Sequence, residues 1–322
     1  MPFILRPFSE QDYEALAVIN NATYPEHRTN AEDWRSVDQQ FSEGGYILHR
    51  YMVVETDTQQ VVGLGSIQHA IPPMEFHPQK FKMHLMVRPQ WRRRGVGNLI
   101  FEHLMDELRT LKAVTVWAGT GEDNADALAF LQKRGFVEIM RGWELWLSVA
   151  GANLSQFLPV AEHVASQGIL ITTLEEERGR DPDYLRKLHE LSNAAFADVP
   201  PDRFKPVPFE DFVRGLEQPN MLPDAYFIAK HGNRYIGFSS LAHWEGTPER
   251  LTQEGIGVRQ EYRRRSVGTA LKVKTIEYAR RHGYKTIAAW DYSTDTAILA
   301  LNEKLGFRRH AGYVYMEKSL QG

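Results

Sequence analysis

Residues 87–100 read VRPQWRRRGVGNLI, and residues 258–271 read VRQEYRRRSVGTAL. The two stretches lie 171 residues apart, and 7 of their 14 aligned positions are identical. A second pair follows at the same offset, with FLQKRGF at 130–136 and LNEKLGF at 301–307. Because this period is too long for a solenoid unit, the sequence predicts that one whole domain has been duplicated.

The two copies are expected to span 1–150 and 151–322, with a connector near 149–167. Hydrophobic periodicity and turn residues predict the same elements in each copy, which indicates two α/β domains with helices on a mixed sheet. In the first copy the expected elements are a strand pair (51–55 and 61–67), a strand (81–87), a helix (97–111), a strand (114–118), a helix (125–134) and a last strand pair (136–140 and 143–148). In the second they include a helix (268–282), a strand (286–291), a helix (296–305) and a strand (313–318).

The composition excludes several classes of protein. The 322 residues include no cysteine, so there is no disulfide framework, no thiolate metal site and no cysteine nucleophile. The balance of 38 basic and 41 acidic residues argues against a protein that coats nucleic acid over its whole surface. No apolar run approaches the roughly 20 residues of a membrane span, and the start lacks a signal-peptide pattern. We therefore expect a cytoplasmic protein, and the scattered histidines predict no metal site.

The arginine-glycine segment predicts a phosphate site. In a turn between a strand and a helix, successive backbone N–H groups and the free N–H groups of the first helical turn bind phosphate oxygens. We expect such pockets at 92–98 and 263–269. The segment lacks the Gly-Lys-Ser/Thr of a nucleoside-triphosphate loop, and Ile100 and Leu271 replace the third glycine of a dinucleotide fingerprint. The alternative is a solvated basic turn, which duplication in register disfavours.

The order strand, Arg-x-x-Gly-x-Gly turn, helix, strand and a helix ending in Lys-x-Gly-Phe resembles the GNAT acyltransferase superfamily. The resemblance covers essentially the whole chain, twice, as in tandem proteins that carry two such domains. It implies that each copy has a mixed, splayed β-sheet flanked by helices. It further implies that acetyl-CoA is the acyl donor and that an amine accepts the acetyl group.

The resemblance also implies where acetyl-CoA binds. Its pyrophosphate is expected at the two turns, and its pantetheine arm along the preceding strands at 85–87 and 256–258. Because Ser266 adds a Cβ where the motif has glycine, we predict tighter binding in the first copy. The expected cofactor residues are Leu85, Met86, Val87, Arg92, Arg93, Arg94, Gly95, Val96, Gly97 and Asn98 in the first copy, and Val258, Arg263, Arg265, Ser266 and Gly268 in the second.

Both copies depart from the family pattern at the general acid. Many family members have a tyrosine where Leu131 and Asn302 stand. In the second copy the nearest candidate acid is Tyr292, and the candidate base is Glu254 on the strand before the phosphate turn. The competing interpretation of Tyr292 is an aromatic side chain that covers the sheet. That of Glu254 is a surface carboxylate without a catalytic role. In the first copy, His84 lies on the comparable strand and is the corresponding candidate. The alternative is a histidine that is packed and hydrogen-bonded in the fold without a catalytic role.

Acyl transfer by direct attack of an amine needs a base, an acid for the leaving thiolate and N–H donors for the oxyanion, but no protein nucleophile. This suits a chain without cysteine. The sequence therefore predicts an N-acetyltransferase for a primary amine of a small molecule or peptide. The alternative is a catalytically degenerate pair of CoA-binding or sensing domains. We expect acetyl-CoA and an amine as partners, with no nucleic acid and no membrane. The loops 71–79 and 200–212 are candidate lids of the acceptor site.

Overall fold

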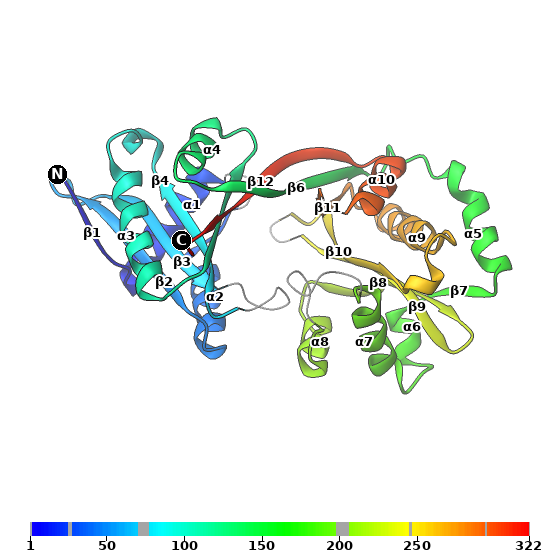
Figure 1. The fold of residues 1–322 in the computed structure, drawn as a ribbon. Coiled ribbons are helices and arrows are strands. Elements are labelled where there is room, and N and C mark those ends of the chain that lie inside the picture. The colour runs from blue at the N-terminus through cyan, green and yellow to red at the C-terminus, as the bar shows by residue number, and fades with distance from the viewer. Residues whose placement is uncertain are drawn as a thin grey trace. The chain divides into compact units, whose positions relative to one another are not determined.

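The computed structural model describes residues 2–24, 28–69, 77–197, 206–244, 247–293 and 295–321. Its backbone divides into two compact units (Figure 1). Unit 1 comprises Met1–Thr120, Asn124–Ile139 and Val314–Gly322, and unit 2 comprises Gly121–Asp123 and Met140–Tyr313. Each unit follows the mixed α/β plan expected from the repeat.

The sheet of unit 1 has the strand order β1-β2-β3-β4-β5-β12. Neighbouring strands from β1 to β4 are antiparallel, whereas β4 and β5 are parallel. Helix α3 packs so closely on β3 that a Cβ at Gly65 would overlap the side chain of Ile100. The elements are β1 (Phe3–Pro7), α1 (Tyr13–Thr23), α2 (Ala31–Glu43), β2 (Leu48–Glu55), β3 (Val61–His69), β4 (Lys80–Val87), α3 (Val96–Thr110), β5 (Thr115–Gly121), α4 (Ala125–Gln132) and the second half of β12 (Arg308–Ser319).

Unit 2 repeats this plan with the strand order β6-β11-β10-β9-β8-β7. Strands β10 and β11 are parallel and the other neighbours are antiparallel. Helices α9 and α7 cover opposite faces of this sheet (Figure 1). The elements are β6 (Val137–Ser148), α5 (Leu158–Ser166), β7 (Ile169–Thr173), α6 (Leu174–Arg178), α7 (Tyr184–Ala195), α8 (Phe209–Leu216), β8 (Met221–His231), β9 (Arg234–His243), β10 (Arg250–Val258), α9 (Val267–Arg281), β11 (Thr286–Tyr292) and α10 (Thr296–Leu305).

The last strand of each unit comes from the other copy of the repeat. Strand β6 ends the first copy but pairs with β11 from Thr286↔Ser148 to Tyr292↔Gly142, inside unit 2. The end of β12 completes unit 1, where Val314 and Met316 are 1% exposed in its core. The units therefore differ from the expected ranges 1–150 and 151–322, because residues 140–150 belong to unit 2 and residues 314–322 to unit 1.

Most expected elements are present within a few residues of the predicted bounds, and two expected segments differ. Helix α2 had no expected counterpart. The last strand pair of the first copy, expected at 136–140 and 143–148, is the single strand β6. The stretch 200–212, expected to be a loop, contains the start of α8, whereas residues 200–205 lie outside the described part of the chain. The other candidate lid, 71–79, lies mostly outside it as well.

Candidate functional site: two phosphate turns, a cleft and a β-bulge

The turn between β4 and α3 has the geometry of an anion-binding turn. Arg93 and Gly95 adopt left-handed backbone conformations, with φ of 61° and 89°. Gly95 is the N-cap of α3, and the first intrahelical bond runs from the N–H of Leu99 to the carbonyl of Gly95, 3.0 Å. The N–H groups of residues 96–98 precede that bond, so they are free of intrahelical partners. They and the positive end of the helix dipole favour a phosphate.

Unit 2 builds the same turn with one residue changed. Arg264 and Ser266 have φ of 60° and 63°, and Ser266 caps α9. Arg263 donates from Nε to the carbonyl of Val258 (3.2 Å), as Arg92 does to Val87 in unit 1 (3.1 Å). The serine thus holds the glycine's conformation at an energetic cost, since a side chain disfavours positive φ. The loss of affinity at Ser266 stays a prediction.

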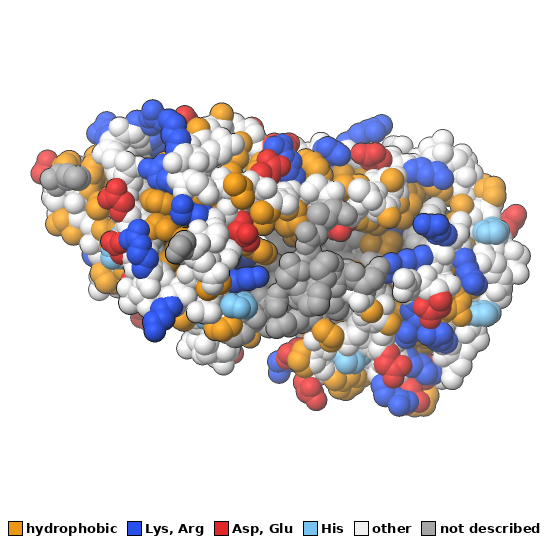
Figure 2. All heavy atoms as spheres, in the orientation of Figure 1, with side chains coloured by type: hydrophobic (Ala, Val, Ile, Leu, Met, Phe, Trp, Pro, Cys, Tyr) orange, Lys and Arg blue, Asp and Glu red, His pale blue; other side chains and the backbone are white. Residues whose placement is uncertain are grey.

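Beside its turn, unit 1 has a cleft with a volume of about 460 Å³. Parallel pairing of β4 and β5 is recorded from Lys80↔Thr115 to Lys82↔Trp117, and the cleft begins with the next residues along both strands. Lys and Arg side chains gather over this end of the unit (Figure 2). Of the expected cofactor residues, Leu85, Met86, Val87, Arg92, Arg93, Gly95, Gly97 and Asn98 line the cleft.

The other expected cofactor residues have different surroundings. The Arg94 guanidinium lies over the ring of Trp91, 4.9 Å from its centroid. The Val96 side chain is 1% exposed in the core, which leaves only its backbone N–H for a ligand. In unit 2, Arg263 also donates to the carbonyl of Ala195 (2.9 Å), and Arg265 lies over Tyr262. The two turns thus share the stacking of an arginine on an aromatic ring, and the bond from Arg263 to Ala195 is an addition in unit 2.

Sequence reasoning missed the contribution of α4 and Arg134 to the cleft. The Arg134 guanidinium lies 3.5 Å from the centroid of Phe130 and donates to Asn98 Oδ1 (2.5 Å) and to the carbonyl of Phe130 (2.9 Å). Burial lowers its pKa. This places a positive charge one hydrogen bond from the phosphate turn. At the matching position of unit 2 stands Leu305, so the repeat itself carried the signal: a charge present in one copy only.

The candidate base Glu254 lies in a β-bulge. Strand β10 pairs with β9 through Gln253↔Leu241 and then Gly255↔Ser240, which leaves Glu254 as the extra residue. A bulge re-aims a side chain and ends regular pairing, and bulges are common beside active sites. Glu254 is exposed to solvent at the bulge, and partial desolvation by the surrounding protein raises its pKa. A carboxylate with a raised pKa is suited to accept a proton near neutral pH.

The comparable strand of unit 1 has no such interruption. His84 faces Ser66 in an unbroken register from Gly63↔Val87 to His69↔Phe81. Its ring also keeps accessible surface, and burial lowers its pKa to about 4, with Lys82 and Arg50 adding to the shift. The ring is therefore neutral at neutral pH and holds a proton weakly.

The candidate acid Tyr292 lies beyond the paired part of β10 and β11. These strands pair from Arg250↔Thr286 to Thr252↔Ala288, so both Glu254 and Tyr292 follow the last recorded pair. Along its other edge β11 pairs with β6, and there Tyr292 is the partner of Gly142. Both candidates thus belong to the splayed half of the sheet, on its two different arms.

Inside unit 2, two charged residues and an asparagine replace three uncharged residues that line the unit 1 cleft. Lys272, Asp291 and Asn302 stand where unit 1 has Phe101, Thr120 and Leu131, all three of which line its cleft. In unit 2 these three residues are buried, with Lys272 1%, Asp291 7% and Asn302 1% exposed. Asn302 donates to Asp291 Oδ2 (2.6 Å), and Lys272 donates to Gln253 Oε1 (3.1 Å). Asn302 Oδ1 has no partner within the described chain.

We predict that Lys272→Met leaves the stability at pH 7 unchanged or raises it. Burial lowers the pKa of Lys272 to about 8, so the fold disfavours its charged form. Wild-type stability should therefore rise between about pH 8 and pH 10.4, where the unfolded chain binds the extra proton. The variant should lack this slope, because methionine fills a similar volume without a charge. Thermal unfolding from pH 7 to 10.5 measures both effects.

The control is Lys274→Met, which removes a half-exposed lysine paired with Glu277 on the same helix. It should change stability little at any pH. A Lys272→Met protein that is clearly less stable than wild type at pH 7 would contradict the prediction. It would mean that the contacts of the ammonium with Gln253 and with the Phe307 ring, 4.5 Å away, outweigh its desolvation.

Comparison with known families agrees with both halves of this fold. The model of the "Acetyltransferase (GNAT) domain" matches residues 3–137, and that of the "Acetyltransferase (GNAT) family" matches residues 185–307. The chain therefore belongs to the GNAT acetyltransferases, with two GNAT domains in tandem, and is an enzyme of the acetyltransferase class. Acetyl-CoA is the acyl donor of this family.

Its relatives include a mycothiol acetyltransferase of Thermobispora bispora, 27% identical over 263 residues, which make up 79% of this chain and 78% of the relative. A [ribosomal protein bS18]-alanine N-acetyltransferase of Salmonella typhimurium is 42% identical over 55 residues, or 17% of this chain and 37% of that protein.

Solved structures share the tandem fold. A GCN5-related N-acetyltransferase from Sphaerobacter thermophilus superposes with a TM-score of 0.72 at 17% identity, over 100% of this chain and 96% of the other. A tandem GNAT protein from the clavulanic acid biosynthesis pathway gives a TM-score of 0.67 at 18% identity, over 98% of each chain. Among the described residues, no helix is long and apolar enough to cross a membrane.

Proposed function

We propose that this chain transfers the acetyl group of acetyl-CoA to a primary amine of a small molecule or peptide. The observation that carries the proposal is the pairing, in one splayed sheet, of a phosphate turn with a bulged carboxylate, Glu254. The turn is suited to bind the pyrophosphate of CoA. Beyond Thr252, β10 pairs with β9 but no longer with β11, and this open edge is suited to bind the amide-rich arm. The relatives named for a small molecule and for a protein alanine support an amine of either kind.

In this mechanism the transfer occurs in unit 2 without an acyl-enzyme. Glu254 accepts a proton from the ammonium of the acceptor, and the freed amine attacks the thioester carbonyl. The C–N bond forms, the C–S bond breaks, and the nitrogen releases its second proton to water. The departing thiolate takes a proton from water or from Tyr292, which water then reprotonates. The products are an N-acetyl amine and free CoA. Unit 1 binds acetyl-CoA more tightly, since it keeps Gly95 and Gly97 and adds Arg134.

One set of features favours a second candidate, a CoA-binding module that has lost catalysis. Neither copy has the family's tyrosine at Leu131 or Asn302, and Lys272 lies buried where unit 1 lines its cleft with Phe101. In that case acetyl-CoA should bind and raise the melting temperature, as a ligand of the native state does. No amine should be consumed.

The test is turnover of acetyl-CoA with a panel of amines that includes small aminated sugars and thiols and a peptide with an N-terminal alanine. We expect release of CoA and formation of an N-acetyl product with at least one class. Mass spectrometry of the protein after mixing with acetyl-CoA alone should show no added acetyl group. A stoichiometric acetyl-protein would overturn direct attack. Binding of acetyl-CoA without turnover across the panel would favour the CoA-binding module that has lost catalysis.

A further inference from the structure

Unit 2 has a cavity of its own, distinct from its phosphate turn. It lies between α7 and the turn that joins β8 to β9, and its volume is about 460 Å³. None of residues 263–268 lines it. We call it the hairpin pocket and define it by the side chains used below, Lys187, Glu190, Asn233, Arg234, Tyr235 and Arg259.

The floor of the hairpin pocket is fixed by a buried polar network. Tyr235 is 2% exposed and donates from its hydroxyl to Glu177 Oε2 (2.6 Å), while Glu177 itself is fully buried. Lys187 donates to Asp181 Oδ2 (2.7 Å) and to Asn233 Oδ1 (2.8 Å). Such a fully bonded network holds its members in one geometry. These bonds therefore hold the Lys187, Asn233 and Tyr235 side of the pocket in place.

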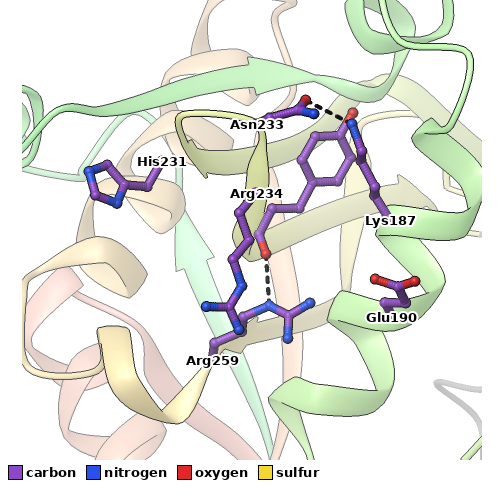
Figure 3. Close-up of a pocket in the computed structure, with 7 residues that line it drawn as sticks. Lys187, Glu190, His231, Asn233, Arg234 and Arg259 are labelled. Atoms are coloured by element: carbon purple, nitrogen blue, oxygen red, sulfur yellow. Dashed lines mark hydrogen bonds between the residues drawn. The ribbon is translucent and has the colours of Figure 1, made fainter.

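Two guanidinium groups converge in this pocket. Figure 3 shows Arg234 and Arg259 with their guanidinium groups toward one another, and the carboxylate of Glu190 beyond Arg259. Arg259 donates from Nε to the carbonyl of Tyr235 (2.8 Å), and its two terminal nitrogens have no hydrogen-bond partner among the described residues. Burial lowers the pKa of Arg259, and the charge of Arg234 lowers it further. Two positive charges thus lie close together, and the terminal N–H groups of Arg259 can donate to a ligand.

The fold does not require Arg234, whereas Arg259 has a counterpart in unit 1, Arg88. Aligning the two hairpins places Gln60 and Val61 of unit 1 where unit 2 has Arg234 and Tyr235, and the same strands form in both units. Acidic groups balance part of the charge, since Glu261 pairs with Arg234 at 2.7 Å. Figure 2 likewise shows basic and acidic side chains intermingled on unit 2. The selective feature is therefore the convergence of donors, rather than an excess of positive charge.

We propose that the hairpin pocket binds a small oxyanion, a phosphate or carboxylate group, between the guanidinium groups of Arg234 and Arg259. Planar guanidinium groups recognise two oxygens of such a group at once. Glu190 lines the same pocket and interacts electrostatically with Arg259, so its negative charge opposes the anion and weakens its binding. This site is separate from acetyl transfer and does not depend on the function proposed above.

The experiment is calorimetric titration of the full chain with inorganic phosphate and, separately, with acetate. Excess CoA occupies the two phosphate turns, and chloride keeps the ionic strength constant. We expect a saturable site for at least one of the probes. Arg259→Met should weaken it at least about 10-fold, as expected for loss of a charge-assisted bidentate contact. Glu190→Gln should strengthen it several-fold, a gain that a misfolded variant cannot produce.

Arg109→Met is the control, because Arg109 is exposed in unit 1 and paired with Asp106 on its own helix. It should bind both probes as wild type does. Arg259→Lys keeps the charge without the planar fork, and it should lie between wild type and Arg259→Met. The proposal is overturned if the CoA-saturated protein binds neither probe, or if Arg259→Met and Glu190→Gln bind the probes as wild type does.

Discussion

Replacing Gly95 with valine is expected to weaken the tighter of two acetyl-CoA binding events by at least about 100-fold, or about 2.7 kcal/mol. Two effects act together. Gly95 has a φ of 89°, which a β-branched residue adopts only with strain. A Cβ there meets no protein atom within 4 Å, so it would project into the open space that we assign to the pyrophosphate. Calorimetric titration with acetyl-CoA measures the loss.

Gly45 provides the matched control for backbone strain. It also lies in unit 1, has a φ of 64°, and has open space where a Cβ would be. It does not line the cleft. Gly45→Val should therefore reduce stability while acetyl-CoA binds normally to the folded protein. If Gly95→Val kept the tight binding and Gly268→Val lost it, unit 2 would hold the tighter site.

Glu254→Gln is expected to lower turnover by about 100-fold or more, the usual contribution of a general base. The variant keeps the shape and one acceptor oxygen of the side chain but cannot take a proton. Burial raises the pKa of Glu254, so the wild-type rate should fall as the pH drops through a value above the ordinary range of glutamate. The variant should lack this acid limb. A profile of kcat/KM against pH tests both points.

His84→Asn serves as the counterpart in unit 1. If transfer occurs in unit 2, this variant should keep both the rate and the acid limb. A Glu254→Gln enzyme with normal turnover would assign the base elsewhere. Loss of activity in His84→Asn would then point to His84, whose pKa of about 4 would place the acid limb at a lower pH.

The expected residues that the structure brings together at the cleft are those set by local backbone chemistry. The Arg-Arg-Arg-Gly-Val-Gly stretch needs only its own glycines and the following helix to form a phosphate turn. For this reason eight of the ten expected residues of the first copy line the cleft. Side chains that act through distant partners were not predictable in this way. Arg134 enters the cleft because Phe130 and Asn98 hold it there, and these contacts depend on how α4 packs against α3.

The strand exchange was hidden for a different reason. Because the copies are so alike, the last strand of either could complete either sheet, and hydrophobic alternation does not say which. The bulge at Glu254 could not be predicted either, since it depends on the register of β10 against β9 rather than on any residue within β10. Contacts between segments far apart in the chain decided both features.

The exchanged strands also set the order in which the protein is finished during its synthesis. Nearly all of unit 1 is made before unit 2, but its core needs Val314 and Met316, which are made after the whole of unit 2. At about 5–20 residues per second, roughly 10–40 s separate the completion of β5 from that of the strand beside it. During that time the nascent unit carries an unpaired sheet edge, which invites mispairing. Unit 2, by contrast, has β6 available before any of its other strands. Its sheet can therefore be completed before that of unit 1, although most of unit 1 is made earlier.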